Sequence, residues 1–433
     1  MSSDAVAVLG FVSLFALMLL RVPVGIAMGL VGVCGFGYLI GDIGPALRLL
    51  AQSPMRTATS AEFAVIPLFL LMGAFASSSG MSRELFRAAN SFLGHLRGGL
   101  GIATIAACGA FAAICGSSVA TAATFSSVAY PEMRRFGYPQ SFSTGVIAAG
   151  GTLGIMIPPS TVLAVYGLIT EQDIGKLFIA GIVPGLVAVS MYIITINLIG
   201  LARPKFLPHG KRAPWRERIE SLRDIWAVIL LFVFVIGGIY AGVFTATEAA
   251  GCGAGGAFII AVLRGRLSRA DFLKSCIDTV RTTASVFTIL IGALIFGYFL
   301  TITQTPQKIT EFLTGLGLGA HEVLILIMLM YLALGCVMDA MAMIILTVPI
   351  VFPVIKQLGF DPIWFGVIIV MTVELGLIHP PVGMNVFVIK SVVKDVKLST
   401  IFYGVLPFVV TDILRLAILI AFPILAIWLP SHM

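Results

Sequence analysis

Two short polar stretches, one in each half of the chain, constrain the fold more than any other feature of this sequence. Each interrupts otherwise apolar sequence, and each is followed by a glycine-containing segment that ends in a pair of prolines. The two regions superpose without a gap at a constant shift of 222 residues, which carries Ser117 to Asp339, Pro131 to Pro353, Gly137 to Gly359, Gly154 to Gly376 and Pro158-Pro159 to Pro380-Pro381. A duplicated element that interrupts helices is therefore predicted.

The surrounding composition places these interruptions inside a membrane. Of the 433 residues, 59% are hydrophobic and 11% are charged, whereas a soluble domain carries roughly 25% charged residues. Apolar runs long enough to cross a bilayer recur from end to end. We therefore expect an all-α, multi-pass membrane protein.

Several other function classes are excluded by the same sequence. The net charge of +7 does not indicate nucleic-acid binding, because the basic residues fall in short loops and form no basic face with interleaved aromatics. No phosphate-binding loop motif is present, which disfavours an ATP-driven pump in one chain. No Ser/His/Asp or His/Glu metal constellation suggests an enzyme.

The repeat predicts the domain organisation. The first repeat spans 1–202, a hydrophilic linker spans 203–223, and the second repeat spans 224–433. Each repeat is expected to contain about five crossings and one re-entrant helical hairpin, followed by a broken helix. The hairpins are predicted at 102–133 and 323–355, and the broken helices at 141–169 and 364–393.

The charge distribution predicts the orientation. The linker Arg203–Arg223 holds seven basic residues and two acidic ones, so the positive-inside rule makes it cytoplasmic. An odd number of crossings per repeat inverts the second repeat relative to the first. Both termini are then outside, and the two hairpins enter the membrane from opposite faces.

Irregular backbone in lipid must line a protein cavity, because unpaired N–H and C=O groups cost several kcal/mol each there. Inverted repeats with discontinuous helices are typical of secondary transporters. We expect unwound carbonyls and hydroxyls at the interruptions to be hard oxygen ligands for a small cation, and helix N-termini after each break to face an anionic substrate. The carbonyls are those of Gly116, Gly151, Gly154, Gly335 and Gly376, and the hydroxyls those of Ser117, Ser118 and Thr152.

Three polar residues leave alternatives open. Carboxylates at membrane depth are functional by default, so Asp339 is a candidate cation ligand, but it is equally well placed to cap the second hairpin helix. Glu374 could orient the loop, bind an ion or carry a proton. His379 is interpreted as a satisfied structural residue in preference to a proton carrier. The alternative for the whole pattern is that Gly, Ser and Pro merely permit close helix packing, which repetition in register disfavours.

These residues together resemble the large membrane subunit of tripartite ATP-independent periplasmic (TRAP) transporters. The similarity runs over nearly the whole chain. It departs from the family pattern at His379, where Thr is more frequent, and at Ala246, where Pro is usual. The segments that carry it are 64–69, 96–100, 116–122, 130–133, 151–154 with 157–160, 180–185, 245–250 and 376–383.

The resemblance implies a sodium-coupled elevator transporter. The hairpins and broken helices would form a mobile transport domain, the remaining helices a scaffold, and the amphipathic segments Ser82–Leu96 and Pro306–Leu316 the arms between them. One sodium site would comprise Gly116, Ser117, Ser118, Gly151, Thr152 and Gly154. The second would comprise Gly335, Asp339, Glu374, Gly376 and His379. Substrate would bridge the tips near Ser118, Thr121, Pro158, Pro159, Pro380 and Pro381.

The resemblance also implies partners and a location. A small four-helix membrane subunit and a soluble periplasmic substrate-binding protein would work with this chain in the bacterial inner membrane, and the substrate would be an organic acid. A stand-alone ion-coupled carrier of divalent anions would share the inverted hairpin plan, and a channel or membrane enzyme is a more distant alternative.

Overall fold

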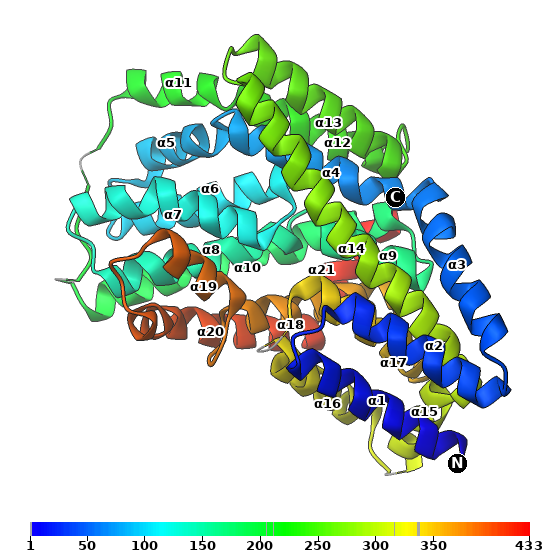
Figure 1. The fold of residues 1–433 in the computed structure, drawn as a ribbon. Coiled ribbons are helices and arrows are strands. Elements are labelled where there is room, and N and C mark those ends of the chain that lie inside the picture. Colours follow the sequence, from blue (N-terminus) through cyan, green and yellow to red (C-terminus); the bar gives the residue numbers. More distant parts are fainter. Residues whose placement is uncertain (1, 205, 211, 316, 336–337) are drawn as a thin grey trace.

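The computed structural model describes residues 2–204, 206–210, 212–315, 317–335 and 338–433, and helices make up most of this part of the chain (Figure 1). The first half contains α1 (Ser3–Leu19), α2 (Val24–Ile40), α3 (Ile43–Thr59), α4 (Val65–Ser78), α5 (Met81–Leu93), α6 (Gly99–Cys115), α7 (Ser118–Arg135), α8 (Gln140–Met156), α9 (Thr161–Thr170) and α10 (Ile174–Ala202).

The second half follows a similar order of elements, except that the single helix α14 covers the positions equivalent to α3 and α4. It contains α12 (Trp226–Tyr240), α13 (Ala246–Leu263), α14 (Arg269–Thr303), α15 (Thr305–Gly315), α16 (Ala320–Gly335), α17 (Ala340–Gln357), α18 (Pro362–Ile378), α19 (Met384–Val392), α20 (Leu398–Ala421) and α21 (Ile424–Ile427). Single 3-10 turns lie at Glu62–Ala64 and Pro430–His432. The same 222-residue shift carries the bounds of α8 onto those of α18.

Six helices in the described part of the chain are long and apolar enough to cross a membrane, or up to eight if each bent pair of helices is one span. Shorter apolar helices such as α1 and α2 have 17 residues each, about 25 Å at 1.5 Å per residue. The chain is therefore a multi-pass membrane protein, and the number of five crossings per repeat stays a prediction.

Two segments differ from the sequence-based expectation. The hydrophilic linker contains an amphipathic helix, α11 (Trp215–Asp224), whose Arg218 and Ser221 are buried. The apolar run at 285–301, which by itself indicates a membrane span, is the end of the 35-residue helix α14, which begins at Arg269. The first half of α14 contains basic and acidic residues, so its sequence does not indicate a membrane span.

The breaks lie at the proline pairs and not at the glycines. We expected Gly150, Gly151, Gly154 and Pro158-Pro159 together to unwind the first broken helix, but α8 continues through the three glycines to Met156, and α18 likewise continues through Gly376 to Ile378. A glycine costs a helix only about 1 kcal/mol, which tertiary packing can offset. Proline lacks the N–H donor that helix continuation needs, and both Pro-Pro bonds are cis.

Glycine instead allows helices to approach closely. A Cβ on Gly150 would lie 2.8 Å from the sulfur of Cys108 in α6, and one on Gly404 would lie 1.8 Å from the carbonyl oxygen of Ser141 in α8. Close approach of this kind is how small residues serve membrane helix packing. The alternative that such residues permit close helix packing therefore describes these two glycines.

Helices of the two halves pack in exchanged pairs. Helix α2 packs against α14 and α4 packs against α13, while α8 contacts α20 and α18 contacts α10. Figure 1 shows the long helix α14 running diagonally beside α2, with α6, α7, α8 and α20 grouped on the other side of the molecule. Because corresponding helices exchange partners, the two halves are interlocked and do not form separate cores.

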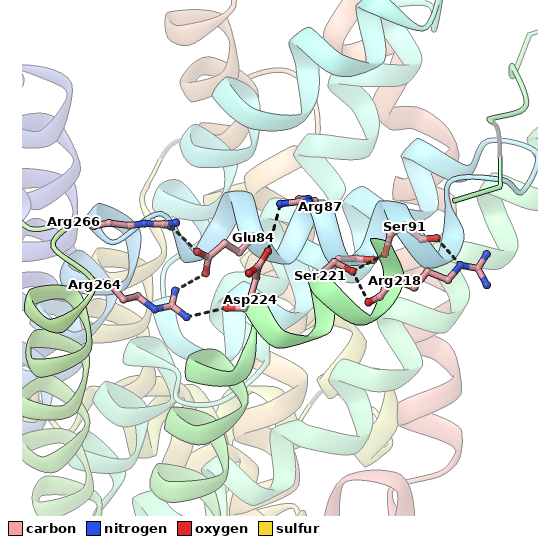
Figure 2. Close-up of polar contacts among 9 residues, drawn as sticks. Glu84, Arg87, Ser91, Arg218, Ser221, Asp224, Arg264 and Arg266 are labelled. Atoms are coloured by element: carbon pink, nitrogen blue, oxygen red, sulfur yellow. Dashed lines mark hydrogen bonds and ion pairs between the residues drawn. The ribbon is translucent and has the colours of Figure 1, made fainter. Parts of the chain in front are cut away.

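Helix α5 is tied to the linker helix and to the loop between α13 and α14 by ion pairs (Figure 2). The carboxylate of Glu84 accepts from Arg264 at 2.6 Å and from Arg266 at 2.5 Å, and its side chain is 12% exposed. Arg264 also donates to the carbonyl oxygen of Asp224 at 2.9 Å. The cluster thus joins three segments at one end of the molecule.

Replacing Glu84 with glutamine is expected to lower the melting temperature of the purified protein by several degrees. The change removes two charge-assisted hydrogen bonds in a largely buried position, each worth about 1.5–3 kcal/mol. Thermal unfolding in detergent measures the effect. The control is Glu220→Gln, which breaks an exposed pair with Arg216 and is expected to change stability by less than about 0.5 kcal/mol. Equal effects of the two substitutions would contradict the prediction.

Candidate functional site

The first hairpin tip rests on the first helix break. Helix α6 ends at Cys115, and its C-cap Gly116 has a left-handed φ of 61°. Ser117 caps α7 by accepting a hydrogen bond from the N–H of Ala120 at 3.3 Å. The hydroxyl of Thr161, just after the break, donates to the carbonyl oxygen of Gly116 at 2.9 Å. A Cβ on Gly154 would lie 2.5 Å from the carbonyl oxygen of Ser117. Tip and break therefore share one packed, oxygen-rich region.

The second tip contacts the second broken helix in a corresponding way. A Cβ on Gly335 would lie 2.8 Å from the Cα of Gly376, so the end of α16 touches the last turn of α18. Asp339 caps α17, with Oδ1 accepting from the N–H groups of Met341 and Ala342 at 3.0 and 3.1 Å. The second tip is predicted at Cys336–Asp339, of which Cys336 and Val337 lie outside the described residues.

The expected carbonyl ligands differ in their availability. Gly151 lies inside α8, so its carbonyl is not unwound as expected, whereas Gly154 and Gly376 belong to the last turns of α8 and α18, where helical carbonyls lack partners. The carbonyl of Ser117 accepts from the N–H and hydroxyl of Thr121 at 3.1 and 2.8 Å. A carbonyl has two lone pairs, so the Ser117 oxygen has both in use, whereas the last-turn carbonyls of Gly154 and Gly376 have room to accept a cation.

Asp339 and His379, two residues whose roles the sequence leaves open, lie at helix ends. Asp339 has the capping role, and a cation-binding role remains a proposal. His379 is the C-cap of α18, and its Nδ1 is buried without a hydrogen-bond partner in the described part of the chain. The interpretation of His379 as fully satisfied therefore fails for this nitrogen.

Glu374 belongs to a buried polar chain that crosses the core. Its Oε2 accepts from Arg415 at 2.7 Å, and Arg415 also pairs with Asp412 at 3.2 Å. The hydroxyl of Tyr192 lies 2.8 Å from both carboxylate oxygens of Asp412 and 3.2 Å from the hydroxyl of Thr152. Thus Thr152 of the first candidate site and Glu374 of the second are joined through α10 and α20.

The candidate substrate residues lie at the two breaks and the first tip. Ser118 exchanges hydrogen bonds with the amide of Asn385 in α19, at 2.7 and 3.0 Å. Thr121 is buried beside it, whereas Pro381 is exposed at the second break. Pro158 and Pro159 are buried, and the carbonyl of Pro159 lies close to Gly116. The first tip thereby contacts both broken helices.

Sequence reasoning missed four residues of this region. Asp412 and Arg415 are charged residues within an apolar span, and the argument applied to Glu374 would have selected them. Asn385, the first polar side chain after the second break, carried a weaker signal of the same kind. Tyr192 carried no sequence signal, because a tyrosine in an apolar helix is ordinary.

Comparison with known proteins agrees with this architecture. Residues 11–425 match the family model described as tripartite ATP-independent periplasmic transporter, DctM component. The chain is 40% identical over 387 residues to the C4-dicarboxylate TRAP transporter large permease protein DctM of Pseudomonas aeruginosa, covering 89% of this chain and 90% of that protein. It is 31% identical to the sialic acid TRAP transporter large permease protein SiaM of Vibrio cholerae, covering 94% and 95%.

A solved structure shares the fold. The YdaH transporter of Alcanivorax borkumensis superposes with a TM-score of 0.61 over 90% of each chain, at 15% sequence identity. These matches are to transporter permeases and not to enzymes, so the class of protein is a multi-pass membrane transporter subunit. The chain belongs to the DctM family, the large permease subunits of tripartite ATP-independent periplasmic transporters.

Proposed function

We propose that this chain couples the inward sodium gradient to uptake of a small organic acid delivered by a soluble periplasmic binding protein. The observation that carries the proposal is that each hairpin tip packs on its own broken helix, through Ser117 on Gly154 and through Gly335 on Gly376. Sodium would bind carbonyl and hydroxyl oxygens at these two contacts. The capping carboxylate of Asp339 would add a charged ligand at the second site alone.

An organic acid is the substrate class that the relatives support. Their names include C4-dicarboxylate, sialic acid, isethionate and ectoine transporters. In this chain the substrate would lie between the tips, near Ser118, Thr121 and the proline pairs. Helices α7 and α9 begin beside the first tip and the first break, and helix N-termini favour negative charge.

The transport step would be an elevator movement of the two hairpins and the two broken helices. Contacts support one change to the expected division into transport domain and scaffold. Helices α10 and α20 pack on α8 and α18, and the buried polar contacts of Tyr192, Asp412 and Arg415 bind them together. These two helices would move with the transport domain. A cavity lined by Arg56, Leu168, Leu290 and Pro349 separates part of that domain from α3 and α14.

The chain would act in the bacterial inner membrane with a small four-helix subunit, and both termini would lie in the periplasm. The basic linker with its helix α11 would then lie on the cytoplasmic surface. Fusions to the C-terminus test this orientation. Alkaline phosphatase is expected to be active there and green fluorescent protein dark, and the reverse result would refute it.

Uptake by the reconstituted complex tests the proposal. Proteoliposomes that contain this chain and its small subunit are expected to take up a radiolabelled dicarboxylate only with an inward sodium gradient and added binding protein. Replacing sodium with potassium is expected to reduce uptake more than tenfold. Uptake that needs no binding protein would favour the stand-alone anion carrier, and sodium-independent flux would favour a channel.

A further inference from the structure

A buried chain of polar groups links the two candidate cation sites to each other. It runs from Thr152 through Tyr192, Asp412 and Arg415 to Glu374, with successive separations of 3.2, 2.8, 3.2 and 2.7 Å. The guanidinium of Arg415 also lies 5.9 Å from the centre of the Tyr192 ring. All five side chains are buried, so bulk water does not screen the interactions between them.

The two end residues of this buried polar link, Thr152 and Glu374, occupy equivalent positions in the two repeats. The shift of 222 residues carries Thr152 onto Glu374, so each repeat contributes the same turn of its broken helix. The connecting groups are not equivalent, because the same shift carries Ser190 and Ile193 onto Asp412 and Arg415. The second repeat therefore supplies all the charge of a link that serves both repeats.

The link is poorly suited to a purely stabilising role. Two carboxylates face one guanidinium, and Oε1 of Glu374 together with Nε and Nη1 of Arg415 has no hydrogen-bond partner in the described residues. Buried ion pairs rarely stabilise a fold more than apolar packing would, and partly satisfied networks are worse than an apolar core. The open oxygen of Glu374 leaves room for a cation at that end of the link.

We infer that Tyr192, Asp412 and Arg415 are positioning residues that couple cation occupancy at the first site to cation occupancy at the second. A cation near Glu374 withdraws that carboxylate from Arg415, which then pairs more closely with Asp412. Asp412 in turn holds the Tyr192 hydroxyl, and thereby sets the orientation of Thr152. Coupling between two sites is reciprocal, so sodium at either site favours sodium at the other. This inference rests on the proposed sodium coupling.

Substituting Tyr192 with phenylalanine tests the link, because it removes one hydroxyl and keeps the ring. Uptake by the complex in proteoliposomes is measured against sodium concentration. In the wild type we expect a Hill coefficient well above 1. In Tyr192→Phe we expect it to fall towards 1 and the half-saturating sodium concentration to rise about fivefold, a typical coupling factor. The rate at saturating sodium is expected to stay within about twofold, since removing one net hydrogen bond is worth about 1 kcal/mol.

The matched control is Thr195→Val. Thr195 forms a 2.6 Å hydrogen bond with Thr411 between the same two helices, α10 and α20. It is not one of the groups that link Thr152 to Glu374. It is expected to leave the sodium curve unchanged. If Tyr192→Phe does not fold, as judged by size-exclusion chromatography, Asp412→Asn replaces it with the same expected loss of cooperativity.

Two different failures can be told apart. Sodium-dependent uptake with a Hill coefficient that is 1 in the wild type, or that Tyr192→Phe leaves unchanged, would overturn the coupling and leave the proposed function standing. Uptake that does not depend on sodium at all would overturn the proposed function itself, and the coupling with it. A loss of cooperativity in Thr195→Val as well would reduce the effect to general packing between α10 and α20.

Discussion

Replacing Arg415 with methionine is expected to remove most of the folded protein. Arg415 is fully buried and pairs with Glu374 and Asp412, which are also buried. Methionine fills similar space but leaves two carboxylates close together without a countercharge. Removing one partner of a buried ion pair costs about 3–5 kcal/mol, a large part of the stability of most proteins. The monodisperse peak in fluorescence-detected size-exclusion chromatography measures the loss.

Two further variants sharpen this test. Arg216→Met removes a guanidinium whose side chain is 90% exposed, and the peak is expected to stay unchanged. Combining Arg415→Met with Glu374→Gln and Asp412→Asn removes all three charges, and much of the peak is expected to return, because coupled residues behave non-additively. A normal peak for Arg415→Met alone would mean that the ion pairs of Arg415 with Glu374 and Asp412 contribute little to the stability of the fold.

The second large effect is expected from Gly154→Ala. The added Cβ would lie 2.5 Å from the carbonyl oxygen of Ser117 and 2.9 Å from the N atom of Ser118, which are backbone atoms that a side-chain rotation cannot remove. The first hairpin tip must therefore move away from α8. We expect the half-saturating sodium concentration for uptake to rise more than tenfold, because the shift separates the oxygens proposed to bind one ion.

Gly297→Ala is the control for this substitution. Gly297 also lies inside a long apolar helix, α14, but an added Cβ there meets nothing within 4 Å. It is expected to leave uptake unchanged. If Gly154→Ala transports with an unaltered sodium dependence, the contact between Ser117 and Gly154 is a packing contact and not part of a cation site.

Much of the candidate site could be predicted from local sequence. The Pro-Pro pairs predict the two breaks because proline lacks a helix donor, and Ser117 and Asp339 predict helix starts because their side chains can accept from free N–H groups. The glycines were harder to interpret. Gly151 and Gly154 are equally compatible with an unwound helix and with a close contact, and the difference depends on which backbone lies opposite.

The sequence by itself determined the duplication, the membrane environment and the family resemblance, because residue spacing and hydropathy are local properties of the chain. The tertiary structure alone decided which helices meet. Tyr192 and Asp412 are separated by 220 residues, and no local pattern specifies that their helices pack together. Contacts between distant segments depend on the shape of whole helices, and so the link from Thr152 to Glu374 emerged only when those helices were placed together.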